Sequence, residues 1–264
     1  MYKLKSPLET LVVLLWSGWQ LFLRDFRRRY RLAYLGYFWA FSRVVITSAP
    51  FVLVGHQFGF EGQNAPIPYA LYVFMGVFLY QVFWDALFLP LRFGRRSRKI
   101  MHEVYIRPEA ILLAGCCNSL FNAALSLFPL IVLLFVFQFV PALTIVLMLL
   151  VGIPALLLFG LAIGIWLIPI NMVYLDFRYG VASLSTVLIF SAPIVYVMPK
   201  DGILAAINLW NPLTYLITVP RTWALVGLNG NDWILVLIAV LSLLVLLFSL
   251  RFYRHVMQLA MDLL

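Results

Sequence analysis

The chain has 264 residues, of which 64% are hydrophobic and only 11% are charged, whereas a soluble domain carries about 25% charged residues. This excludes a soluble globular protein, because a fold of this length has too little interior to hide so much apolar surface and needs lipid around it. The net charge is +9, and its placement along the chain decides what it means.

The first segment predicts an amphipathic helix. Apolar side chains recur at helical spacing from Leu8 to Phe26 and polar residues interrupt the other side, while Trp16 and Trp19 suit the lipid headgroup zone. The pattern favours a helix lying in the cytoplasmic membrane interface. A seventh membrane span is the competing interpretation, but the charges from Arg24 onward begin too soon for it.

Six later segments are candidate membrane spans. A helix rises about 1.5 Å per residue and the hydrocarbon core is about 30 Å thick, so a span needs about 20 apolar residues. We therefore predict an all-α integral membrane protein in one domain, with an interface segment at 1–33, spans within 34–252 and a cytoplasmic tail at 253–264. The predicted spans are Tyr34–Gly55, Tyr69–Leu91, Ala110–Phe137, Pro141–Ile168, Val181–Met198 and Trp233–Phe252.

The basic residues predict the orientation of these spans. Sixteen of the nineteen Lys and Arg residues fall at the termini and in alternate loops, and the other set of loops holds only Lys200 and Arg221. Because cytoplasmic loops are enriched in Lys and Arg, both termini are expected in the cytoplasm. The positive charge then marks the membrane surface and does not indicate nucleic-acid binding.

Two ionisable residues fall inside predicted spans, Arg43 in the first and Asp85 in the second. Charged groups are costly at lipid depth, so they usually face protein or water. Counted from the cytoplasmic ends, the two residues lie at similar depth and could pair. A structural Arg–Asp clasp and a role in a translocation path are both open.

The stretch from Pro199 to Asp232 is too polar for a full span, yet it contains short apolar pieces separated by Pro212 and Pro220. Such a segment enters a membrane only where protein or a water-filled cavity satisfies its backbone. We predict a re-entrant pair of half-helices dipping from the outer face before the last span.

No catalytic, metal-binding or ATP-binding motif is present in the sequence. It contains no G-x-x-x-x-G-K-[ST] phosphate loop, no H-E-x-x-H and no G-x-S-x-G, which are the motifs of P-loop NTPases, zinc proteases and serine hydrolases. Uphill transport would therefore need an energy source in a partner or in an ion gradient.

The loop from Arg92 to Pro108 is the sharpest local feature. Its first half is a basic run, and its second half is amphipathic, with an apolar face at helical spacing formed by Ile100, Met101, Val104 and Tyr105. Positive-inside charge accounts for the basic run but not for a short apolar face held away from the bilayer. That face indicates a contact with a cytoplasmic protein.

Aromatic residues form 16% of the chain. Some belong to interface belts and others lie within spans, where packing against neighbouring helices competes with a role in a channel. Sugar rings present flat C–H faces that stack on aromatic rings, so an aromatic-lined wet channel suits a glycan.

Several segments together resemble the permease subunits of type-2 ABC exporters, in the group that exports O-antigen, capsule and teichoic acid polymers. The resemblance covers nearly the whole chain, and the order and spacing of its pieces are specific. The pieces are Leu35-Gly-Tyr-Phe-Trp39-Ala, Ile100-x-x-x-Val104-Tyr-Ile-Arg107-Pro, Asn171-Met-Val-Tyr-Leu-Asp176-Phe-Arg178-Tyr, Ser191-Ala-Pro193-Ile-Val-Tyr196, Asn211-Pro-Leu-Thr and Arg221-Thr-Trp-Ala-Leu-Val-Gly227.

The resemblance implies a homodimer in the bacterial cytoplasmic membrane, with two copies of an ABC nucleotide-binding subunit below it. ATP and Mg²⁺ belong to that partner, and no cofactor is expected in this chain. The cargo would be a lipid-linked glycan moved along the dimer seam. Coupling to the partner would fall on Ile100, Met101, Glu103, Val104, Tyr105 and Arg107, with Asp176 and Arg178 as a secondary contact. Channel-lining candidates are Tyr37, Phe41, Arg43, Phe190 and Tyr196.

Three other functions compete with this interpretation. A type-2 permease for a small lipid or drug more often has a large outer insert, and the outer loops here are short. A membrane enzyme needs clustered acids or a His–acid pair near one face, which the sequence lacks. A channel or gradient-driven carrier would usually carry more buried acids.

Overall fold

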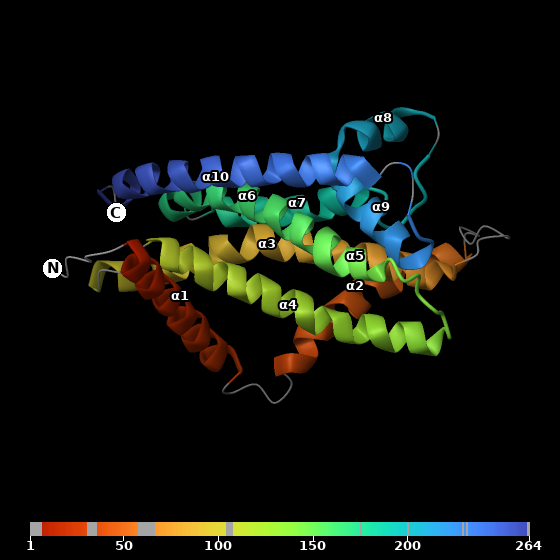
Figure 1. The fold of residues 1–264 in the computed structure, drawn as a ribbon, viewed down its shortest axis with the longest axis horizontal. Coiled ribbons are helices and arrows are strands. Elements are labelled where there is room, and N and C mark those ends of the chain that lie inside the picture. The colour runs from red at the N-terminus through yellow and green to blue at the C-terminus, as the bar shows by residue number, and fades with distance from the viewer. Residues whose placement is uncertain are drawn as a thin grey trace.

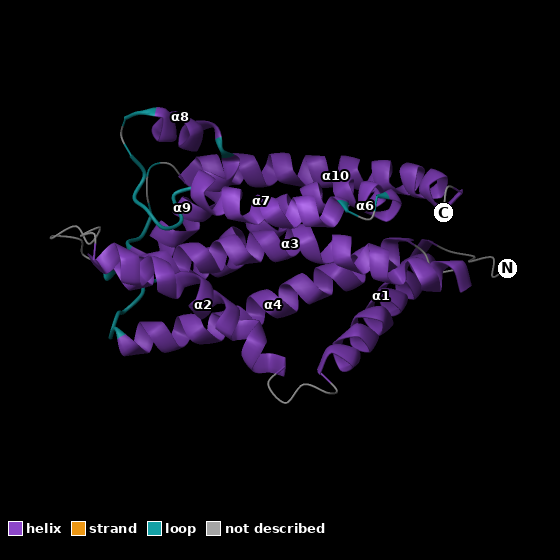
Figure 2. Cartoon of the chain, turned by 180° about the vertical axis from the view of Figure 1, so that it is seen from behind, coloured by secondary structure: helices purple, strands orange, loops and turns teal. Residues whose placement is uncertain are grey.

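A computed structural model describes residues 7–30, 36–57, 67–103, 108–174, 176–199, 201–228, 230 and 232–262. Every regular element within these residues is a helix (Figure 2), and the longest helices run side by side as an elongated bundle (Figure 1). The start of α1 and the end of α10 lie at the same end of this bundle. The α-helices are α1 (Pro7–Tyr30), α2 (Gly36–Gln57), α3 (Tyr69–Glu103), α4 (Pro108–Val136), α5 (Ile145–Leu147), α6 (Ile153–Val173), α7 (Phe177–Ser191), α8 (Ile203–Trp210), α9 (Pro212–Leu225) and α10 (Asp232–Asp262).

Helix α3 is the core of the bundle. It packs against α6 on one side and α4 on the other, and α10 packs on the far side of α6. Of the apolar part of α3, 78% is buried, against 22% for α10. Because α10 keeps such a large apolar surface exposed, it needs a hydrocarbon surrounding, as the composition predicts.

Four helical stretches are long and apolar enough to cross a bilayer, or five if the bent pair α8–α9 counts as one span. The prediction of six is therefore supported in part. Two further apolar stretches, Ser42–Gly55 of α2 and Phe177–Ser191, are shorter. At 1.5 Å per residue the second is only about 22 Å long, less than the thickness of the hydrocarbon core.

Prolines explain where the helices depart from the predicted spans. The fifth span was expected to reach Met198, but α7 ends at Ser191 because Ala192 precedes Pro193 and takes an extended conformation (φ −120°, ψ 153°). The fourth was expected to begin at Pro141, but helix begins at Ile145 and continues through a π-helical turn, Met148–Gly152. Pro154 follows this turn and has no N–H for a regular α-helical bond.

Helix α1 covers the predicted amphipathic segment and packs against α4. Its second half is anchored by aromatic contacts, with the Phe26 ring edge-on to Phe121 at 5.0 Å. Val12 and Trp16 in its first half, and Trp19 at its middle, are exposed. These exposed side chains are available to a membrane surface.

The predicted half-helices are α8 and α9, which meet at an 84° bend. Asn211 caps the N-terminus of α9, because its side-chain oxygen accepts a hydrogen bond from the Leu213 N–H at 3.0 Å. Pro212 occupies the first helical position. Pro220 was expected to break this region as well, but it lies inside α9. Figure 1 shows α8 standing beyond α10 at one end of the bundle.

Candidate functional site

A charged pair joins α2 to α3 within the apolar part of the bundle. Arg43 Nη2 donates to Asp85 Oδ2 across 2.6 Å, so the contact expected from their similar depth is present. The Asp85 side chain is 7% exposed and the Arg43 side chain 41%. The pair is neutral as a whole, but part of one cation remains at the surface of helices that are otherwise apolar.

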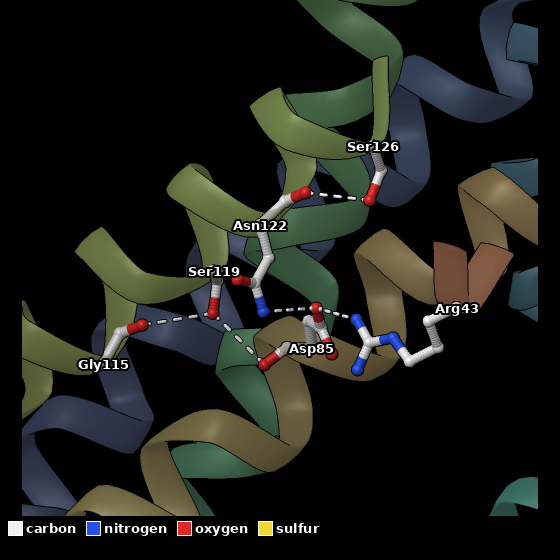
Figure 3. Close-up of polar contacts among 6 residues, drawn as sticks. All are labelled: Arg43, Asp85, Gly115, Ser119, Asn122 and Ser126. Atoms are coloured by element: carbon white, nitrogen blue, oxygen red, sulfur yellow. Dashed lines mark hydrogen bonds and ion pairs between the residues drawn. The ribbon is translucent and has the colours of Figure 1, made fainter. Parts of the chain in front are cut away.

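Helix α4 extends this pair into a polar cluster of three helices (Figure 3). Asn122 Nδ2 donates to Asp85 Oδ2 at 2.9 Å, and Ser119 Oγ donates to the Asp85 backbone carbonyl at 3.1 Å. Ser126 Oγ donates to the Asn122 carbonyl. These residues were not among the candidates predicted from the sequence, although polar side chains three and four residues apart within an apolar span are a detectable signal.

The polar cluster has more hydrogen-bonding capacity than its protein contacts use. Arg43 Nε and Asn122 Oδ1 are buried without a partner, and so is Gln81 Oε1, one turn before Asp85 on α3. Arg43 Nη1 has no partner among the described residues and is not enclosed. Buried polar groups nearly always have partners, so the arrangement suits a polar ligand or ordered water.

The candidate channel residues come from α2, α7 and the segment after α7. The Phe51 and Phe190 rings lie 5.9 Å apart, which brings α2 and α7 together, and half of Phe190 is exposed. The Tyr196 hydroxyl donates to Asn208 Oδ1 at 3.1 Å, so this hydroxyl is turned toward the protein. Tyr37 and Phe41 belong to α2, but their side chains lie outside the described part of the chain.

The candidate coupling residues are only partly described. Ile100, Met101 and Glu103 form the end of α3, without described side chains, and Val104, Tyr105 and Arg107 lie outside the described residues. Asp176 is exposed just before α7, and the Arg178 guanidinium packs over the Tyr179 ring at 4.6 Å. Asn171, shortly before them, donates to the Leu91 carbonyl at 3.0 Å. This contact places the α6–α7 turn beside the later part of α3.

A fully buried cation, Arg221, lies near the start of α3. Arg221 was expected in an outer loop, but it belongs to α9 and is 3% exposed. Its Nη2 donates to the Tyr72 hydroxyl at 2.7 Å, its Nη1 to the Ile194 carbonyl at 3.2 Å, and its guanidinium lies 3.7 Å above the centre of the Tyr72 ring. It forms no ion pair with a carboxylate among the described residues.

Arg221, Tyr69 and Tyr72 together form what we call the carbonyl clasp. The Tyr69 hydroxyl donates to the Val195 carbonyl at 2.8 Å and the Tyr72 hydroxyl to the Tyr196 carbonyl at 3.2 Å. Arg221 donates to the Ile194 carbonyl, so side chains bind three consecutive carbonyls of the non-helical segment 192–199. The clasp therefore satisfies backbone groups that a helix would otherwise pair internally.

Among the described residues, no group of three or more His, Cys, Asp or Glu side chains could hold a metal ion. The polar cluster and the carbonyl clasp each bring several buried polar groups together in the described part of the chain. Comparison with protein-family models found no match. Comparison with curated proteins found none either.

Proposed function

We propose that the chain is the transmembrane permease subunit of an ATP-driven exporter that moves a lipid-linked polysaccharide across the bacterial cytoplasmic membrane. The observation that carries the proposal is the 84° bend between α8 and α9, directly before the last long helix. A bend of this kind belongs to a broken span or to a re-entrant loop, and the resemblance to type-2 ABC permeases implies a re-entrant loop at this place. An amphipathic first helix and the order of the motifs add support.

In this proposal a second copy of the chain completes a path lined by α2 and α7. The partly exposed Arg43 supports it, because a charge facing lipid costs at least about 2.5–3.5 kcal/mol and faces protein or water instead. Tyr37, Phe41, Phe190 and Tyr196 are the aromatic candidates for lining this path. Their rings would stack on sugar faces without selecting one sugar.

The coupling assignment predicts loss of export in a double variant, Val104→Asp with Tyr105→Asp. Two carboxylates on the apolar face would abolish the contact with the nucleotide-binding subunit, because burying unpaired charges at an interface is costly. We expect the tagged wild-type chain, extracted in mild detergent, to retain an ATP-hydrolysing subunit with vanadate-sensitive activity. The double variant should no longer retain that subunit. The amount of surface glycan in cells carrying it should fall at least about tenfold.

Ser97→Asp is the matched control, since it adds a carboxylate to the basic run outside the apolar face. Thermal unfolding should be alike in the double variant, the control and the wild type. Normal surface glycan in the double variant would remove the coupling role from these residues. A wild-type chain that always purifies alone would overturn the exporter proposal.

The proposed topology has six spans, a first helix in the interface and both termini in the cytoplasm. In a background of Cys116→Ala and Cys117→Ala, cysteines replacing Gly62 and Gly230 should react with an impermeant maleimide applied to intact cells. A cysteine replacing Gly180, an exposed position near the start of α7, should react only after lysis. The reverse pattern would invert the orientation.

A permease for a small lipid is the second candidate, favoured by an apolar groove between α3, α6 and α7. The groove has a volume of about 270 Å³ and its lining includes Phe83, Leu87, Phe159 and Leu184, with Asn211 as its one amide. Such a lining suits a hydrocarbon chain better than a glycan. Stimulation of ATP hydrolysis by a short lipid, but not by lipid-linked glycan, would favour this candidate.

A further inference from the structure

Arg43 offers a hydrogen-bonding edge that no described protein group uses. A guanidinium carries five N–H donors, and the only bond that Arg43 makes among the described residues is the one from Nη2 to Asp85. Nη1 remains accessible, and the side chain as a whole is 41% exposed. This edge is available to a ligand that accepts hydrogen bonds and carries negative charge.

The surroundings of Arg43 select an amphiphilic ligand. Val45 and Ile46 are exposed beside it on α2, and Arg43 lies about 10 Å along the helix from its first residue at 1.5 Å per residue. A free inorganic ion would have to leave water to reach a cation in this apolar setting. A phosphate attached to a hydrocarbon chain gains contact with both the guanidinium and the apolar face.

The polar cluster allows Arg43 to be shared. Asp85 Oδ2 accepts from Asn122 as well as from Arg43, so the carboxylate keeps a partner when the guanidinium turns toward another anion. Phosphate and Asp85 would then compete for one cation. If Arg43 is an anion site, loss of the Arg43 charge weakens phosphate binding and loss of the Asp85 charge strengthens it. A purely structural ion pair does not give these opposite effects.

We propose that Arg43 is the binding residue for the phosphate group of a membrane lipid, with Asp85 as its competitor and Asn122 as the residue that positions Asp85. The proposal rests on the proposed function in one respect, since the lipid would be the carrier of the exported polymer. The binding itself requires no nucleotide-binding subunit.

The test measures binding of dodecyl phosphate to the purified full chain in a non-ionic maltoside detergent, by native mass spectrometry. The double variant Arg43→Gln with Asp85→Asn removes both charges and keeps a neutral hydrogen-bonded pair, so it is expected to fold and to bind dodecyl phosphate at least about tenfold more weakly. Asp85→Asn alone should bind about threefold or more tightly than wild type. Dodecanol should bind all variants equally, and Arg251→Gln, an exposed cation on α10, should match wild type.

A structural clasp gives a different pattern. It predicts that Asp85→Asn weakens dodecyl phosphate binding or leaves it unchanged, and that the double variant binds as wild type does; either result overturns the proposal. Inorganic phosphate that binds as tightly as dodecyl phosphate, and depends equally on Arg43, would support the anion site but assign it to the free ion. Because the readout needs no ATP hydrolysis, failure of this test leaves the exporter proposal standing, and failure of partner co-purification leaves the anion site standing.

Discussion

Replacing Gly164 by valine is expected to destabilise the helix bundle by about 3 kcal/mol or more. A Cβ atom at this position would lie 2.5 Å from the Leu87 carbonyl oxygen and 3.1 Å from the Leu87 Cα. These are backbone atoms of α3, so relief requires separating α3 from α6, the central packing of the bundle. We expect the variant to lose its monodisperse peak in detergent and to have a lower midpoint of thermal unfolding.

Gly180→Val is the matched control for this prediction. It is also a helical glycine, on α7, but a Cβ atom added there would meet nothing within 4 Å. We expect its thermal midpoint to stay close to wild type, apart from the small cost of a β-branched residue. A Gly164→Val protein as stable as this control would show that the contact between α3 and α6 accommodates a larger side chain.

The same packing explains why a second glycine lies one turn earlier. A Cβ on Gly160 would be 2.6 Å from the Phe83 carbonyl oxygen. Gly160 and Gly164 thus form the G-x-x-x-G spacing through which membrane helices bring their backbones together. Gly160→Val should act in the same direction, and the double variant should not add fully, because both residues open one interface.

Replacing Arg221 by leucine is expected to release the segment 192–199. The variant removes the donors to the Ile194 carbonyl and the Tyr72 hydroxyl, and a hydrogen bond to a charged group contributes about 1.5–3 kcal/mol. Amide hydrogen exchange between Ile194 and Met198 should accelerate by about tenfold to a hundredfold. Arg221→Lys should give an intermediate rate, because it keeps the charge but not the planar fork.

Tyr215→Phe is the control on the same helix. Its hydroxyl donates to the Leu209 carbonyl at the end of α8 and does not touch the clasp. Exchange in 192–199 should remain at the wild-type rate in this variant. Unchanged exchange in Arg221→Leu would mean that Tyr69 and Tyr72 hold the segment without the guanidinium.

The clasp also accounts for Gly76 on α3. A Cβ there would lie 2.5 Å from the Ile194 carbonyl oxygen and 3.0 Å from Arg221 Nη1. The segment 192–199 can therefore approach α3 closely only because this position has no side chain. Gly76 and Arg221 thus both meet the Ile194 carbonyl, one by leaving space for it and the other by donating to it.

The sequence by itself determined the features that depend on a few neighbouring residues. The apolar runs predicted the helices α3, α4, α6 and α10, because about 20 apolar residues have no other stable form in lipid. The amphipathic spacing predicted α1, and polar residues with Pro212 predicted the pair α8–α9. The C-terminal end of α7 and the π-helical turn follow from Pro193 and Pro154, although the predicted boundaries did not use these prolines.

Part of the candidate site could also be predicted. Arg43 and Asp85 were singled out because ionisable residues are rare in apolar spans, and similar depth suggested that they meet. The coupling segment was singled out by an apolar face on a loop, and its role stays a prediction. Asn122 was missed although it recurs at helical spacing with Asn118 and Ser126, because that spacing does not tell which neighbouring helix the polar face meets.

Only the tertiary structure decided which distant residues meet. Arg221 counted as an outer-loop cation in the sequence, yet it is buried against Tyr72, 149 positions away. Asn122 reaches Asp85 across 37 positions, and Gly164 meets the backbone of Leu87. Sequence patterns report how one segment divides its faces between lipid and protein, whereas the rotation and depth of each helix against its neighbours are set by the packing of all of them together.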